Sequence, residues 1–123
     1  MRKVILDANS ILRYMLNDIP EQADATENTL LTREILILPE VVAEVVYTLV
    51  KYYKYTRKEA AHDILEFLKD ADYTELTLLT ALNTYSDMNL DFVDCLLFAY
   101  SMHYDVLTFD KALQKLIAKG GAV

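Results

Sequence analysis

Residues 4–16 read VILDANSILRYML and predict a strand followed directly by a helix. The run at 4–6 is short, apolar and rich in β-branched side chains, which indicates a buried strand. Asn9 or Ser10 can cap the helix, because short polar side chains accept hydrogen bonds from its first free backbone N–H groups. Asp7 therefore falls at the junction between a strand and a helix.

The same alternation of short apolar runs and helical segments continues along the chain. Further strands are predicted at 35–38, 75–79 and 106–108, and helices at 20–32, 40–53, 56–69, 80–87, 91–103 and 111–119. Thr56 and Glu59 form a capping-box signature, and Thr80 is the expected cap of the helix that ends near residue 87. Strands that alternate with helices favour an α/β fold, a three-layer α/β/α sandwich around a short parallel sheet. The length fits a single domain over residues 1–123.

Composition and charge restrict the class of protein. The chain is 54% hydrophobic, which favours a folded core, yet it has no apolar run of the roughly 20 residues that a membrane span needs. Its start lacks the apolar stretch of a signal peptide, and the single Cys95 suits a reducing cytoplasm. A net charge of −7 argues against a protein that coats nucleic acid. It does not exclude an enzyme whose metal ions supply local positive charge.

Two aspartates lie at the predicted carboxyl ends of strands. Asp7 follows the first strand and Asp110 follows the last. In parallel sheets the functional crevice lies beyond these strand ends. Taken alone, each residue is better explained by ordinary helix capping than by catalysis.

Glu44 and Asp94 lie within apolar helical segments. We expect both to be buried, and a buried carboxylate is costly unless it is paired or binds a metal. The alternative for Glu44 is a solvent-facing stripe shared with Lys51. Asp94 has no lysine or arginine partner within its helix, and Asp91 at the helix start is the expected cap.

The four acids together predict a site for a hard divalent cation. Oxygen-only ligands suit Mg²⁺ or Mn²⁺ better than zinc. Mutual repulsion would keep some of these carboxylates protonated until a cation binds. One or two such ions can activate water for phosphodiester cleavage. The pattern thus predicts metal-dependent phosphoryl transfer, without naming the substrate.

Four stretches, in order, resemble the PIN-domain ribonucleases, and most closely the VapC-type toxins of toxin–antitoxin pairs. They are LDANSILRY at 6–14, AEVVYTL at 43–49, DFVDCLL at 91–97 and LTFD at 107–110. The stretch LRYMLNDIPEQ at 12–22 is similar to one branch of these toxins.

The resemblance implies a PIN-like fold and a Mg²⁺- or Mn²⁺-dependent endoribonuclease that cleaves RNA with metal-activated water. It also implies a cognate antitoxin partner, a homodimer and a cytoplasmic location. By position, Asp7, Glu44 and Asp94 match the core acidic ligands and Asp110 matches a more variable fourth acid. Asn9 matches a polar residue that hydrogen-bonds within the site, and Thr108 a hydroxyl that orients the acids.

Two other functions compete with the ribonuclease. A haloacid-dehalogenase-like phosphatase would need a second aspartate two residues after Asp7, and Asn9 stands there. A catalytically silent PIN-like binding or scaffold module would be expected to lack one or more of the acids, and all four are present.

Two other features could contact partners. Arg13 is the candidate for binding a phosphate or an inhibitor's carboxylate. The basic, aromatic stretch KYYKYTRK at 51–58 could stack RNA bases, pack internally or bind the antitoxin. We favour packing and partner binding for this stretch.

Overall fold

A short parallel sheet opens the fold of the computed structural model, which describes residues 1–121. Strand β1 (Val4–Ile5) pairs with β2 (Ile35–Leu36), with Val4 opposite Ile35 and Ile5 opposite Leu36. The chain divides into two compact units, Met1–Thr74 and the part from Glu75 onward. No helix within residues 1–121 is long and apolar enough to cross a membrane.

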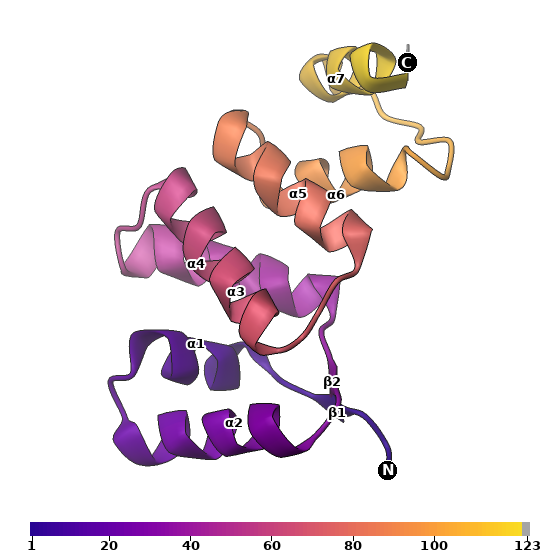
Figure 1. Ribbon diagram of the computed structural model, residues 1–123. Coiled ribbons are helices and arrows are strands. Elements are labelled where there is room, and N and C mark those ends of the chain that lie inside the picture. Colours follow the sequence, from indigo (N-terminus) through magenta and orange to yellow (C-terminus); the bar gives the residue numbers. More distant parts are fainter. Residues whose placement is uncertain (122–123) are drawn as a thin grey trace. The chain divides into compact units, whose positions relative to one another are not determined.

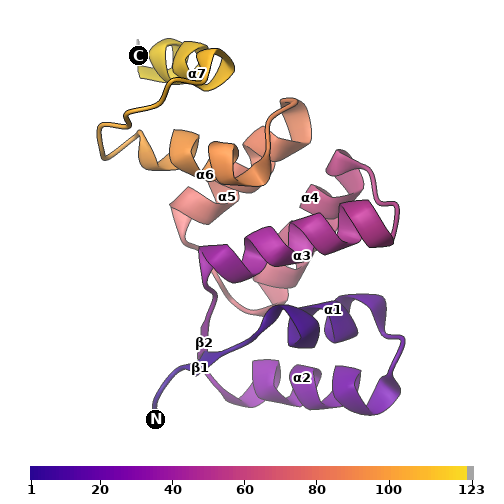
Figure 2. The ribbon, with the colours of Figure 1, turned by 180° about the vertical axis from the view of Figure 1, so that it is seen from behind.

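In the first unit four helices lie to one side of this sheet (Figures 1 and 2). They are α1 (Ala8–Leu16), α2 (Pro20–Thr32), α3 (Pro39–Tyr52) and α4 (Arg57–Asp70). Helix α1 packs on α2 and α3, and α3 packs on α4. Their shared core is built from fully buried side chains, among them Ile11, Ile37, Leu49, Ile64, Phe67 and Leu68.

Local signals explain where these helices begin. Pro20 and Pro39 occupy first-turn positions, where a missing N–H is tolerated. The predicted capping box is confirmed: Glu59 N–H donates to Thr56 Oγ1 at 3.1 Å, and Thr56 N–H donates to Glu59 Oε1 at 2.9 Å. The cap of α1 is Asp7 rather than Asn9 or Ser10.

The second unit is helical over its described residues. It contains α5 (Leu76–Asp87), α6 (Phe92–Tyr100) and α7 (Lys111–Gly121). The predicted strand at 75–79 is therefore wrong, and Thr80 lies inside α5 rather than before it. Buried residues of α5 recur at helical spacing, as Leu78, Ala81, Leu82 and Tyr85. That periodicity extends beyond the short window from which a strand was predicted.

The predicted strand at 106–108 is also absent from the described chain, which runs from 105 to 110 without regular structure. Leu107 is 87% exposed and Phe109 is 86% exposed. An extended preference becomes a strand only when a neighbouring strand pairs with it. The described sheet consequently has two strands instead of the predicted four.

A hydrogen bond links α1 to the end of α4. Tyr14 Oη donates to Asp70 Oδ2 at 2.7 Å, and the Tyr14 ring meets the Phe67 ring edge-on at 5.8 Å. Burial, and then the bond to Asp70, raise the pKa of Tyr14 to about 12. The fold therefore favours the neutral phenol.

We expect Tyr14→Phe to destabilise the protein by about 1 kcal/mol, because the hydrogen bond is lost while the ring remains. The parent has nine tyrosines, and the ultraviolet titration of the variant should lack the one that ionises near pH 12. In the parent, the contribution of Tyr14 is complete below pH 10 and is lost as the pH rises through 12. The exposed Tyr104→Phe serves as control; equal urea midpoints for both variants would contradict this role for Tyr14.

Candidate functional site

Asp7 lies where β1 gives way to α1. Its Oδ1 accepts a hydrogen bond from Ser10 N–H at 2.8 Å. This backbone bond, followed by a bond from the Ser10 side chain, holds the pKa of Asp7 below its usual value. Asp7 is exposed and ionised, and a carboxylate has acceptor capacity beyond one capping bond.

A polar cavity of about 270 Å³ adjoins Asp7 in the first unit. It is lined by residues of α1 and α2 and by the cap of α1, namely Asp7, Asn9, Ser10, Arg13, Gln22, Ala25 and Thr26. Gln22 and Thr26 were not predicted from the sequence. Thr26 is buried, and its hydroxyl donates to the carbonyls of Ser10 and Gln22 at 3.3 and 3.1 Å. The weak apolar pattern of α2 gave no signal that this face meets α1.

Arg13 is fixed beside this cavity. Its Nη1 lies 3.1 Å from Asp18 Oδ2, and its Nη2 donates to Tyr53 Oη at 3.3 Å. The side chain is only 13% exposed. Within the described residues its Nε is buried without a hydrogen-bond partner. The guanidinium is thus held in place with one donor still unsatisfied.

Glu44 is exposed, so the predicted burial of this residue is wrong. Helix α3 buries a different face, made of Val42, Val45, Val46 and Leu49. Glu44 lies on the solvent-facing stripe with Lys51, the alternative that the sequence left open. Burial therefore supplies no argument for a metal at Glu44.

Asp94 in the second unit was predicted to be buried, and it is only partly so. It is partly buried in the first turn of α6. Burial, followed by the charges of Asp110 and Asp91, raises its pKa. The structure thus brings Asp91 and Asp110 close enough for their charges to act on Asp94.

Asp110 is held by the start of α7. Its Oδ1 accepts from Leu113 N–H at 2.8 Å, and its own N–H donates to Thr108 Oγ1 at 3.1 Å. Gln114 Nε2 donates to the Thr108 carbonyl at 2.7 Å. Asp91 stands at the capping position of α6 but makes no side-chain cap there. Thr108 therefore contacts the backbone of the acid that it was predicted to orient.

The donor chemistry of these acids suits a hard divalent cation. They offer only oxygen, and a cation would offset the burial and the repulsion that raise the pKa of Asp94. Neither unit, over residues 1–121, gathers three or more histidine, cysteine, aspartate or glutamate side chains in the arrangement of a metal site. Asp7 and Glu44 belong to the first unit, and Asp91, Asp94 and Asp110 belong to the second.

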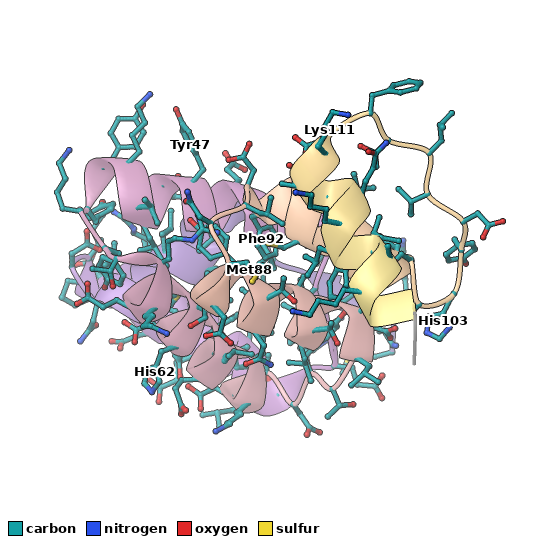
Figure 3. All side chains as sticks on the ribbon, turned by 90° about the horizontal axis from the view of Figure 1, so that it is seen from above. Tyr47, His62, Met88, Phe92, His103 and Lys111 are labelled. Carbon is teal, nitrogen blue, oxygen red and sulfur yellow. The ribbon has the colours of Figure 1, made fainter. Side chains whose placement is uncertain are left out.

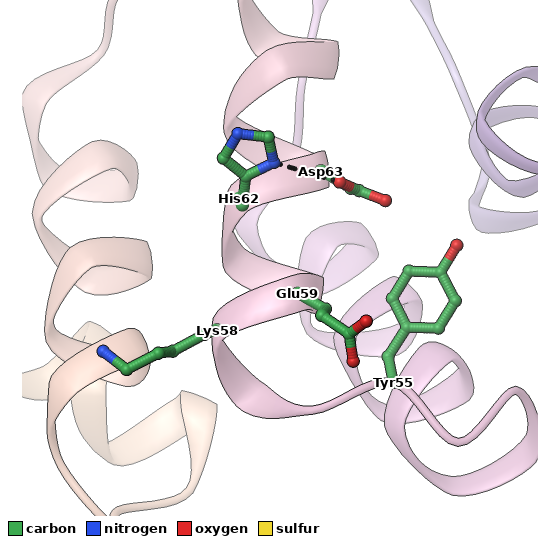
Figure 4. A pocket seen from close by; sticks show the side chains of 5 residues that line it. All are labelled: Tyr55, Lys58, Glu59, His62 and Asp63. Carbon is green, nitrogen blue, oxygen red and sulfur yellow. Dashed lines mark hydrogen bonds and ion pairs between the residues drawn. The ribbon is translucent and has the colours of Figure 1, made fainter.

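A second open pocket, of about 420 Å³, lies at the start of α4 (Figure 4). It is lined by Tyr55, Lys58, Glu59, His62 and Asp63. His62 Nδ1 lies 3.1 Å from Asp63 Oδ1, yet the His62 side chain is 72% exposed. The pocket contains none of the predicted site residues.

Comparison with known families assigns the class. The family model described as PIN domain matches residues 4–119, which covers nearly the whole chain and both units. The chain belongs to the PIN domain family, and this confirms the predicted PIN-like α/β fold class. PIN domains are generally nucleases and typically use divalent metals. No curated protein and no solved structure matches the chain.

We expect Asp94→Asn to raise the melting temperature in EDTA at neutral pH by about 2–4 °C. The substitution removes a partly buried charge that Asp110 and Asp91 repel. Ionisation of Asp94 has no effect below the ordinary pKa of 3.8 and destabilises the fold as the pH rises through the raised pKa. The gain should therefore shrink as the pH falls toward 3.8.

The matched control is Asp24→Asn, an exposed aspartate of α2, which should leave the melting temperature unchanged. A lower melting temperature for Asp94→Asn at neutral pH would show that the charge of Asp94 is favourably partnered instead.

Proposed function

We propose that this protein is a metal-dependent endoribonuclease, and that it is the toxin of a type II toxin–antitoxin pair. The observation that carries the proposal is the raised pKa of Asp94 beside Asp91 and Asp110, in a chain of the PIN family. A cation of the kind that PIN nucleases use would relieve this repulsion. The choice of RNA, and of a toxin acting in the cytoplasm, follows the resemblance of residues 6–14 and 12–22.

Four acids are the proposed ligands of one or two Mg²⁺ or Mn²⁺ ions: Asp7, Glu44, Asp94 and Asp110. When bound, the metal would activate water and stabilise the charge that develops on the RNA phosphodiester. Asp7 would present an ionised carboxylate, because its bonds with Ser10 favour that form. A bound cation would lower the pKa of Asp94 and so favour its ionised form.

Neighbouring groups would position these ligands. Thr108 holds the backbone of Asp110 at 3.1 Å, and Asp91 adds negative charge next to Asp94. Asn9 lines the same cavity as Asp7 and would hydrogen-bond within the site. Arg13 would meet a substrate phosphate or an antitoxin carboxylate, because its side chain lines that cavity. An antitoxin and a homodimer partner are part of this proposal.

A second candidate is a PIN-like binding or scaffold module without catalysis. It is favoured by the finding that neither unit, within residues 1–121, groups three acids as a metal site. Thermal melting with Mn²⁺ separates the two candidates, because a ligand that binds only the folded state must stabilise it. For the nuclease we expect Mn²⁺ at about 100 times its dissociation constant to add about 2.7 kcal/mol, with Asp94→Asn losing most of this gain. No Mn²⁺ stabilisation of the parent would favour the binding module.

The direct test is cleavage of total RNA and of tRNA by the antitoxin-free protein with Mn²⁺ or with EDTA. We expect cleavage only with the metal, and a loss of at least about 100-fold in Asp7→Asn and Asp94→Asn. Asparagine caps helices as well as aspartate does, so Asp7→Asn should still fold.

Asp24→Asn is the control, since it removes an exposed acid of the first unit that does not line the cavity beside Asp7. Equal cleavage by the parent and by folded Asp7→Asn and Asp94→Asn would rule out the proposed site.

A further inference from the structure

Helix α3 exposes a row of side chains with a chemistry unlike its apolar face. Glu44, Tyr47 and Lys51 are spaced three and four residues apart, which puts them on one face of the helix, and all three are exposed. Tyr47 is 54% exposed and extends away from α3 (Figure 3), and Tyr52 is 64% exposed. The packing role predicted for the stretch 51–58 is therefore wrong for Tyr52.

Lys51 ties the two exposed rings together. Its Nζ lies 5.1 Å from the centre of the Tyr47 ring and 5.7 Å from that of Tyr52, and it donates to Tyr47 Oη at 2.6 Å. The rings are 6.2 Å apart at an angle of 77°. Two aromatic rings and a cation are thus held in a fixed arrangement although more than half of each ring residue is exposed. Such preorganisation lowers the entropy lost when a ligand binds.

The local charge is opposite to that of the chain as a whole. Residues 47–58 contain four lysines or arginines and no acidic residue, in a protein of net charge −7. Lys54 is among them, and its Nζ donates to the Lys51 carbonyl at 3.1 Å near the end of α3. Proteins that bind single strands of nucleic acid combine cations for the phosphates with aromatic rings on which bases stack.

We propose that Tyr47, Lys51 and Tyr52 form an RNA-docking surface, on which bases of a single strand stack against the tyrosines and Lys51 pairs with a phosphate. This inference rests on the proposed function, since Glu44 is a proposed metal ligand on the same face. Glu44 and Lys51 are seven residues apart, about 10 Å along the helix, which matches about three stacked nucleotides. The surface would hold nucleotides on one side of the cleaved bond.

The test measures binding separately from cleavage. Fluorescein-labelled oligouridine of about 12 nucleotides is titrated with the protein in EDTA at low ionic strength, followed by fluorescence anisotropy. We expect Tyr47→Ala/Tyr52→Ala to weaken binding at least tenfold, roughly the loss of one stacked base. Tyr47→Phe/Tyr52→Phe keeps the rings and should bind like the parent. Tyr104→Ala, which removes a tyrosine 68% exposed in the second unit, is the matched control.

Lys51 is tested through salt. Lys51→Gln should reduce the slope of log K against log salt by about one, because one phosphate contact is removed. An unchanged slope would overturn the proposed role of Lys51.

The outcomes distinguish this proposal from the nuclease itself. If Mn²⁺-dependent cleavage occurs and the double alanine variant binds oligouridine like the parent, the RNA-docking surface is wrong and the nuclease stands. If binding depends on the two tyrosines but no RNA is cleaved, the surface stands and the nuclease fails. If the double alanine variant changes only self-association in sedimentation, this face joins copies of the chain, and the docking proposal is overturned.

Discussion

Repulsion between carboxylates in the second unit is the constraint on which the proposed metal site depends. Asp94 is partly removed from water and lies within reach of the charges of Asp110 and Asp91, so ionising it is unfavourable. The start of α6 favours an anion through the partial positive charge of the helix, but burial and the two neighbouring charges oppose it. Asparagine would fill the same space without the charge. The cost becomes understandable when a divalent cation is part of the working molecule. The repulsion is confined to α6 and its neighbours, and a need for a cation there agrees with membership of a family that is generally nucleolytic.

Asp7 in the first unit and Asp110 in the second are acids of a different kind. Asp7 has a structural function of its own, since it satisfies an N–H group at the start of α1, and the same bond keeps it ionised. Asp110 does the same for α7. Helix capping therefore holds these carboxylates at helix starts, where the partial positive charge of the helix also favours an anion. At Asp7 and at Asp110, the hydrogen bond that caps the helix also fixes the carboxylate that we propose as a metal ligand. Glu44 differs from both, because it is exposed on α3 and has no such anchoring role.

Much of the first unit could be predicted from the sequence, because its signals are local. The apolar runs at β1 and β2, the prolines that open α2 and α3, and the Thr56–Glu59 capping box each fix an element through nearby residues. The failures have longer-range causes. The strand at 106–108 needs a partner strand, and the strand at 75–79 was inferred from a window too short to reveal the helical spacing of α5. The exposure of Glu44 could not be predicted from its apolar neighbours in the sequence, because the buried valines of α3 lie on another face of the helix. Gln22 and Thr26 were missed because only the packing of α2 on α1 brings them beside Asp7.

The two capping aspartates also bear on how such a protein would change if selection for catalysis were relaxed. Asp7 and Asp110 would still be retained by selection for stability, since each satisfies the start of a helix. Asp94 would be replaced first, because a neutral residue there removes a partly buried charge that is unfavourable. In sequences descended from this one, an acid at position 94 would therefore indicate a working enzyme more reliably than acids at positions 7 and 110.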